Sequence, residues 1–119
     1  MRVLVCGGRD YTDWRAVSDT LRAIHDQTPI GLIIHGNATG ADTMAAHWAL
    51  LAGVREACFT ARWESEGRAA GPLRNQRMLD EGKPDLVVAF PGGKGTADMV
   101  RRANAAGVEV RNVAARSGI

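Results

Sequence analysis

The sequence has 119 residues, of which 45% are hydrophobic and 24% charged, and 15 basic against 13 acidic residues give a formal net charge of +2. This length allows one domain with a buried core and is too short for two. The small, scattered excess of basic residues does not indicate a nucleic-acid surface, and no apolar run approaches the roughly 20 residues that cross a bilayer.

The first half of the chain alternates strand-like and helical stretches. Residues 2–6 predict a strand, and 13–26 a helix whose apolar residues recur every three or four positions behind an N-cap at Asp13. Residues 31–35 predict the second strand, and 41–52 a helix that ends at Gly53. The third strand, 55–60, is less hydrophobic, so we expect it near an edge of the sheet.

The second half continues this alternation. The polar segment 62–71 lacks periodicity and predicts a long loop. A helix is expected from Pro72 to Gly82, a strand over 85–90, a helix over 96–106 that ends at Gly107, and a last strand over 108–113. We expect residues 114–119 to form a frayed tail after a single domain spanning 1–113.

Five strands alternating with four helices predict an α/β fold with right-handed crossovers. The near-continuous apolar runs LVC, LII and LVVAF are typical of parallel strands buried on both faces. We therefore expect one doubly wound, Rossmann-like sheet of about five parallel strands with helices on both faces.

Cys6 and Cys58, the two cysteines, each lie in a strand-like run. We expect two buried, reduced thiols and a cytoplasmic protein, because the sequence shows no secretory signal. No CxxC pair or close His/Cys spacing occurs, so we expect no metal site, and nothing calls for a cofactor.

Three glycine-rich turns each follow a predicted strand and open a predicted helix. They are GGRD at 7–10, HGNATGAD at 35–42 and PGGKGTAD at 91–98. In a parallel sheet all strand-to-helix turns lie along one edge, where ligands bind at the carboxyl ends of the strands. The turns therefore predict one glycine-lined, anion-binding crevice built from three separate segments.

The third turn carries the sharpest signal. Gly92, Gly93 and Gly95 permit positive φ and close backbone approach to a ligand. Thr96 is expected at the start of a helix, whose free N–H groups favour an anion, and Lys94 adds a positive charge. The alternative is a tight turn in which Thr96 only caps the helix. Neither the Walker A pattern nor the dinucleotide fingerprint GxGxxG is matched.

The other two turns offer further candidate ligand-binding residues. In the second, Gly36 and Gly40 flank a polar arch, Asp42 either caps the helix or binds ribose hydroxyls, and His35 contacts either the ligand or the loop. In the first, Gly7 and Gly8 form the turn that presents Arg9 and Asp10. Arg9 fits phosphate because its guanidinium binds oxygens bidentately, whereas the alternative is a surface ion pair between Arg9 and Asp10.

The segment GPLRNQRM at 71–78 places Arg74 and Asn75 in the first turn of the helix predicted from Pro72. A cation there opposes the helix dipole, which favours an anion bound nearby. Met78, four residues after Arg74, is expected in the core. Trp63 in the predicted loop either stacks on a base or anchors the loop.

The ordered motifs GGRD, HGxxxGAD, AGPxRNxxM and FPGGxGTADM resemble the YspA-like branch of the SLOG superfamily, which includes the Lonely Guy cytokinin-activating enzymes and the DNA-processing protein A family. The resemblance runs from about Arg2 to Val113. It implies a Rossmann-like fold and a site for nucleotides or nucleotide-derived ligands.

The Lonely Guy enzymes hydrolyse the N-glycosidic bond of nucleoside monophosphates. Their MHxRKxxM resembles GPLRNQRM, which places Arg74 on their catalytic arginine and Asn75 on their lysine. Their PGGxGTxxE resembles PGGKGTADM, in which Met99 replaces the closing glutamate and Asp98 takes the neighbouring position. The resemblance implies an intact binding apparatus with an altered catalytic carboxylate.

Our first hypothesis is a protein that binds, senses or sequesters a nucleotide-derived small molecule. Its phosphate would lie on the 92–96 turn with Arg74 and Arg9, and its ribose at Asp42 or Asp98. The alternative is a nucleoside 5'-monophosphate N-glycosidase that uses Asp98 and Arg74. Single-stranded DNA binding is disfavoured by the near-neutral charge, and the resemblance to Lonely Guy enzymes implies a homodimer.

Overall fold

The computed structural model describes residues 1–115, so residues 116–119 of the predicted tail lie outside the described residues. The elements are β1 (Arg2–Cys6), α1 (Trp14–Gln27), β2 (Leu32–His35), α2 (Ala41–Ala52), β3 (Arg55–Cys58), α3 (Trp63–Glu66), the 3-10 helix η1 (Gly67–Ala69), α4 (Ala70–Asp80), β4 (Leu86–Ala89), α5 (Lys94–Ala105) and β5 (Glu109–Asn112).

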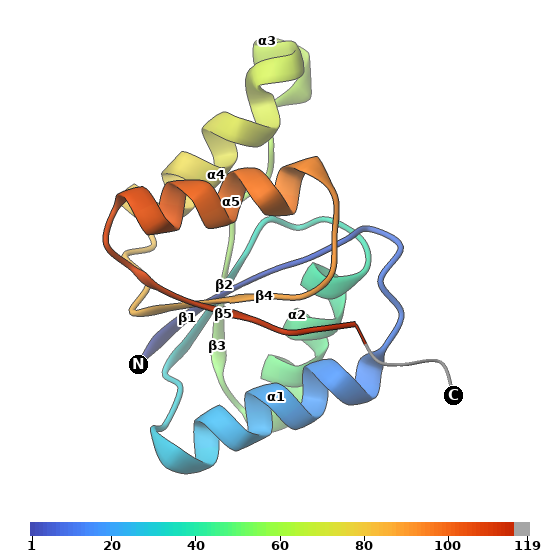
Figure 1. Cartoon of the computed structure of the whole chain (residues 1–119), viewed down its shortest axis with the longest axis vertical. Helices are drawn as coiled ribbons and strands as arrows, with labels where there is room; N and C mark the ends of the chain where they lie inside the picture. The colour runs from blue at the N-terminus through green and yellow to red at the C-terminus, as the bar shows by residue number, and fades with distance from the viewer. Residues whose placement is uncertain (116–119) are drawn as a thin grey trace.

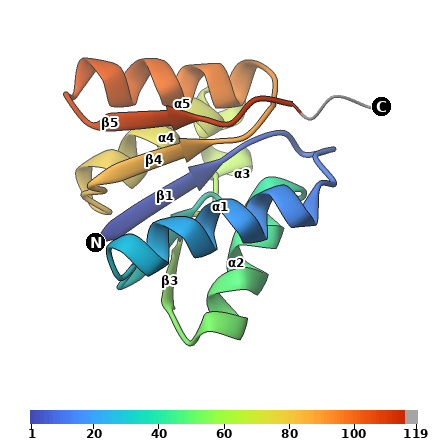
Figure 2. The same cartoon turned by 60° about the horizontal axis from the view of Figure 1, so that its bottom comes forward.

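The five strands form one parallel sheet in the order β3-β2-β1-β4-β5. Helices α1 and α2 cover one face, and α4 and α5 cover the other (Figures 1 and 2). The predicted doubly wound α/β fold is therefore confirmed, with β3 at an edge as expected. Strands β1, β2 and β4 lie side by side at the centre, which brings the three glycine-rich turns that follow them to neighbouring positions.

Each face of the sheet has its own hydrophobic core. Val17, Leu21 and Ile24 of α1 recur every three or four residues and pack with Trp48 of α2 against one face. Burying each such side chain contributes about 1.5–3 kcal/mol. On the opposite face, Met78 of α4 is part of the core, as predicted. Because both faces of the sheet are packed, the strands hold the turns at their carboxyl ends in fixed positions.

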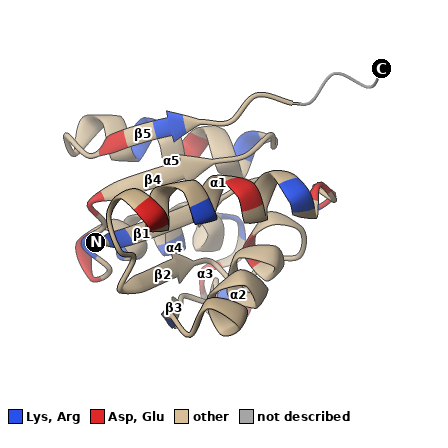
Figure 3. Ribbon diagram, turned by 90° about the horizontal axis from the view of Figure 1, so that it is seen from below, with Lys and Arg blue, Asp and Glu red and all other residues tan. Residues whose placement is uncertain are grey.

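Local hydrogen bonds explain where two helices end. The Asp13 carboxylate accepts a hydrogen bond from the Ala16 N–H at 3.0 Å and caps α1, as predicted. Gly53 closes α2 in the left-handed conformation, with a φ of 71°. Acidic and basic residues alternate along α1 (Figure 3), so the solvent-facing side of this helix carries mixed charge and is not a basic surface.

The predicted loop over 62–71 is wrong, because this segment consists of α3, η1 and the start of α4. Short helical turns need no apolar periodicity: α3 is held by a hydrogen bond from the Glu66 N–H to the Arg62 carbonyl (2.8 Å) and by the ion pair of Glu66 with Arg77 (3.7 Å). The following helix, α4, begins at Ala70 instead of Pro72. Arg74 is therefore its fifth residue, outside the first turn, so the expected conflict with the helix dipole does not arise.

The expectation of two buried thiols is wrong for Cys58, although both cysteines are free. Cys6 lies in the central strand β1 and is buried, whereas Cys58 is exposed on the edge strand β3. An edge strand packs fewer side chains against helices, and β3 lacks a fully buried residue. Within residues 1–115, no helix is long and apolar enough to span a membrane.

Candidate functional site

The three glycine-rich turns contact one another at the carboxyl edge of the sheet. The Gly8 N–H donates to the Pro91 carbonyl at 2.9 Å, and the Gly8 carbonyl accepts from the Ala41 N–H at 3.3 Å. Gly40 has a φ of 76°, and a side chain there would overlap the Gly8 carbonyl and lie 2.6 Å from the Arg9 carbonyl. The first turn therefore lies between the other two and contacts both of them.

Glycines of the third turn allow close approach rather than positive φ. The prediction of positive φ is wrong, because the glycines with positive φ among the described residues are Gly40, Gly53, Gly67 and Gly107. A Cβ at Gly92 would instead overlap Thr96 Oγ1 and lie 2.7 Å from the Gly8 nitrogen, whereas Gly93 and Gly95 face open space. The backbone of this turn is thus accessible to a ligand.

Helix α5 begins at Lys94, two residues earlier than expected, and its N-cap Gly93 supplies no side-chain cap. Thr96 is therefore the third residue of the helix and not its cap, which removes the alternative in which Thr96 only caps the helix. The first-turn N–H groups of α5 remain available at the cavity, an arrangement that favours an anion.

The turns border a cavity of about 790 Å³ that α4 closes from the other side. Thirteen of the 16 predicted site residues line it: Gly7, Gly8, Arg9, Asp10, Asp42, Arg74, Asn75, Gly92, Gly93, Lys94, Gly95, Thr96 and Asp98. The remaining three, His35, Gly36 and Gly40, support its walls from outside. The cavity volume lies in the range of small-molecule sites, about 300–1,000 Å³.

His35 supports the second turn. Its Nδ1 accepts a hydrogen bond from the Asn37 N–H at 3.0 Å, so Nε2 carries the proton and donates to Glu56 Oε2 at 3.1 Å. The ring is buried and does not line the cavity. Of the two roles considered for His35, the structure favours contact with the loop.

Asp42 also holds the second turn in place. Its Oδ2 accepts hydrogen bonds from the N–H groups of Gly36 (3.0 Å) and Ala38 (3.2 Å), and the N-cap of α2 is Gly40. Burial raises the pKa of this carboxyl, although these hydrogen bonds and the nearby His35 and Arg74 oppose the shift. Asp42 lines the cavity as a buried carboxyl whose Oδ1 has no hydrogen bond from the described residues.

Arg74 reaches from α4 to the second turn. Its Nη1 donates to the Gly36 carbonyl at 2.6 Å, and its Nε donates to Asn75 Oδ1 at 3.0 Å. Burial lowers the pKa of Arg74, an effect that Asp42 opposes and that Arg77 and Arg9 reinforce. Within residues 1–115, no hydrogen bond or ion pair engages Nη2, so the fixed guanidinium keeps donors for a ligand.

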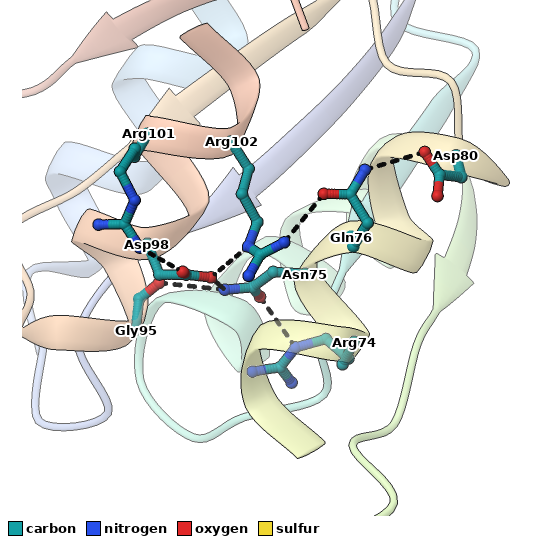
Figure 4. Close-up of polar contacts among 8 residues, drawn as sticks. All are labelled: Arg74, Asn75, Gln76, Asp80, Gly95, Asp98, Arg101 and Arg102. Atoms are coloured by element: carbon teal, nitrogen blue, oxygen red, sulfur yellow. Dashed lines mark hydrogen bonds and ion pairs between the residues drawn. The ribbon is translucent and has the colours of Figure 1, made fainter. Parts of the chain in front are cut away.

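Asn75 joins α4 to α5 (Figure 4). This buried amide accepts from Arg74 and donates through Nδ2 to the Gly95 carbonyl (3.2 Å) and Asp98 Oδ2 (3.0 Å). Its hydrogen-bonding groups are thus occupied within the protein. Asn75 lines the cavity, but its contacts are those of a residue that positions Arg74 rather than one that binds a ligand.

Both oxygens of Asp98 are bound by arginines of its own helix. Arg101 Nη2 donates to Oδ1 at 2.6 Å, and Arg102 Nε donates to Oδ2 at 2.8 Å. Burial tends to raise the pKa of Asp98, but the hydrogen bonds from Asn75 and Arg102 and the charges of both arginines outweigh it, so the pKa is lowered. Asp98 is therefore an ionised carboxylate engaged in structure, and Met99 beside it is fully buried in the core.

Trp63 lines the cavity with 52% of its surface exposed, near Gly71 of α4. Tyr11, Gly71 and Pro91 also line the cavity and were not predicted as site residues. Tyr11 and Pro91 each adjoin a glycine-rich turn, a signal that could have found them. Gly71 opens the segment GPLRNQRM, but it was expected at the end of a loop and not in a helix.

Comparisons with known proteins agree with this architecture. A family model described as "YspA, cpYpsA-related SLOG family" matches residues 1–65, which include the first two glycine-rich turns. The Gene 61 protein of Mycobacterium phage D29 is 40% identical over 121 residues, covering 93% of this chain and 94% of that protein. The two are therefore similar over nearly their full lengths.

A solved structure shares the fold. The X-ray structure of DNA processing protein A from Streptococcus pneumoniae matches 97% of this chain with a TM-score of 0.78 and 18% sequence identity. The match covers 50% of that protein, so this chain spans about half of its length.

Proposed function

The chain belongs to the YspA, cpYpsA-related SLOG family, and on this premise we propose that its cavity binds a nucleotide or a nucleotide-derived ligand with a phosphoribosyl group. The phosphate lies on the 92–96 turn, beside the first N–H groups of α5, in the cavity that Lys94 and Arg74 also line. The ribose lies toward Asp42, whose Oδ1 is free to accept from a hydroxyl group. Such a module senses or sequesters its ligand.

The observation that carries the proposal is the set of cations at the cavity without a carboxylate partner. Four ion pairs join an arginine to a carboxylate within residues 1–115, and none includes Arg9, Arg74 or Lys94, although all three line the cavity. Cations that line the same cavity as accessible helix N–H groups provide the charge-assisted donors that phosphate needs.

The same geometry disfavours hydrolysis of an N-glycosidic bond through Asp98. A carboxylate that activates water or stabilises a developing cation must present a free oxygen to the reacting atoms. The oxygens of Asp98 are engaged by Asn75, Arg101 and Arg102. Binding without turnover is therefore the proposed activity, and Arg74 is proposed as a ligand-binding residue.

Thermal unfolding with AMP, ADP-ribose and related nucleotides tests the binding. A ligand at 100 times its Kd stabilises the folded state by about 2.7 kcal/mol, or about 10 °C in Tm at about 4 °C per kcal/mol for a domain of this size. Arg74→Lys keeps the charge but loses the guanidinium fork, so we expect at least about tenfold weaker binding by calorimetry. Leu73→Ala, on the exposed side of the same helix, is the control.

Three outcomes would contradict the proposal. No shift in Tm with any phosphorylated ligand argues against the site. Release of free base from AMP, abolished by Asp98→Asn, supports the hydrolase instead. Affinity for single-stranded DNA that falls steeply with salt supports nucleic-acid binding.

We also propose a cytoplasmic homodimer, from the two free thiols and the resemblance to Lonely Guy proteins. Light scattering after size-exclusion chromatography measures the mass directly, and a monomer of 12.7 kDa would contradict the dimer.

A further inference from the structure

A second, smaller cavity of about 260 Å³ adjoins the main one. Its walls come from the loop between β2 and α2, from the residues that follow β3, and from the side chains of Arg9, Trp63 and Arg74. These three side chains and Ala38 line both cavities, so the two spaces share a wall at Arg9 and Arg74. We call the smaller space the Arg9–Arg74 cavity.

The charged side chains that line the Arg9–Arg74 cavity are all positive. Arg9 and Arg74 are the charged side chains among the described residues that line it. Asp10 and Asp42 line the main cavity but not this one, and Asp42, whose charge attracts Arg74, has its Oδ2 occupied by two backbone N–H groups. Two guanidinium groups that face one space without a carboxylate repel each other, and a bound anion removes this repulsion.

The walls of this cavity are held by specific hydrogen bonds. The Thr39 hydroxyl donates to the Arg9 carbonyl at 3.2 Å, and the Asn37 amide donates to the Thr60 hydroxyl at 3.4 Å. Arg74 is fixed by its bond to the Gly36 carbonyl. The volume is below the roughly 300 Å³ at which small-molecule sites begin, so the space suits a single anionic group rather than a nucleoside.

We propose that the Arg9–Arg74 cavity binds a second phosphate of the same ligand, so that the ligand is a nucleotide with two separately held phosphate groups. This inference rests on the proposed function, which places the first phosphate on the 92–96 turn. Arg74 lies between the two phosphates, while Arg9 serves mainly the second and Lys94 the first. A nucleoside bisphosphate and a nucleoside diphosphate both supply this chemistry.

Calorimetry on the full chain at constant ionic strength tests the inference. AMP, ADP and adenosine 3',5'-bisphosphate are titrated into the wild type, Arg9→Gln and Lys94→Gln. In the wild type we expect at least one two-phosphate compound to bind about tenfold or more tightly than AMP. Which of the two binds more tightly distinguishes a bisphosphate from a diphosphate.

The two variants remove equal charges from different places, so each is the control for the other. Arg9→Gln is expected to bind the preferred two-phosphate compound and AMP with nearly equal affinity, so that the ratio of these two affinities falls close to one. Lys94→Gln is expected to weaken the binding of both compounds. The ratio of their affinities should stay within about twofold of the wild-type ratio. Arg9 and Lys94 are exposed, so thermal melts of the variants should match the wild type.

Two results would overturn the inference while leaving the proposed function intact. In the first, both two-phosphate compounds bind no more tightly than AMP. In the second, Lys94→Gln lowers the ratio as much as Arg9→Gln, which would mean that the preference reflects overall charge. If no compound binds at all, the proposed function fails and the inference fails with it.

Discussion

Replacing Asn75 with alanine removes the amide that joins α4 to α5. The side chain makes two hydrogen bonds to charged groups, Arg74 and Asp98, and one to the carbonyl of Gly95. At about 1.5–3 kcal/mol for each charged partner and about 0.5–1.5 kcal/mol for the carbonyl, the three bonds set an upper limit of about 7.5 kcal/mol.

The net loss is smaller, because the partners keep other contacts. Asp98 retains two arginines, Arg74 retains the Gly36 carbonyl, and Gly95 is exposed to water. We therefore expect the free energy of unfolding to fall by about 2–4 kcal/mol. At about 4 °C per kcal/mol, the Tm falls by about 8–16 °C.

Urea unfolding of the wild type, Asn75→Ala and Leu73→Ala measures this loss. The midpoint of Asn75→Ala should fall at an unchanged m-value, and Leu73→Ala on the same helix should stay within about 0.5 kcal/mol of the wild type. A loss below about 1 kcal/mol in Asn75→Ala would refute the structural role. If Asn75→Ala keeps wild-type stability but loses nucleotide affinity, Asn75 binds the ligand directly, as first predicted.

Three further predictions concern the turns, a carboxylate and the thiols. Gly40→Ala should destabilise the fold by more than about 2 kcal/mol because of its φ of 76° and its overlap with the first turn, whereas Gly95→Ala, which faces open space, should stay within about 1 kcal/mol in the same melts. The pKa of Asp98 is lowered in the folded state, so its contribution to stability is present above its ordinary pKa of about 4 and is lost as pH falls through the lower folded value. In melts taken at decreasing pH from pH 7, the excess Tm of the wild type over Asp98→Asn should therefore shrink once the pH falls below about 4; a constant difference would contradict this. One thiol, that of Cys58, should react rapidly with a colorimetric disulfide reagent, and Cys6 should react only in denaturant because burial raises its pKa to about 12. Two fast equivalents would be inconsistent with the structure.

The fold and the position of the crevice could be predicted because both depend on pattern. Runs such as LVVAF indicate strands buried on both faces, and each is followed by a glycine-rich turn and a helix. Parallel strands then place those turns on one edge of the sheet. Contacts such as that of Gly8 with Pro91 follow from this topology.

Local helical turns and side-chain partners could not be predicted in this way. The segment 62–71 has no apolar period, and its helical turns are fixed by hydrogen bonds and by an ion pair to Arg77 on the following helix, α4. Cys6 and Cys58 both lie in strands, but Cys58 is exposed because its strand lies at an edge of the sheet. Partners of this kind are set by packing between elements.

The amino-acid sequence by itself determined the sheet, its four long helices and the edge at which the glycine-rich turns meet, because periodicity and glycine positions are local properties. Only the tertiary structure decided which polar groups serve the protein and which remain for a ligand. Asn75 and Asp98 bond to each other across α4 and α5, and His35 bonds to its own loop, whereas Arg9 and Lys94 have no ion-pair partner within residues 1–115. The physical reason is that a polar side chain bonds to whatever partner the packing of other elements brings within about 3 Å, and no pattern along the chain encodes that distance.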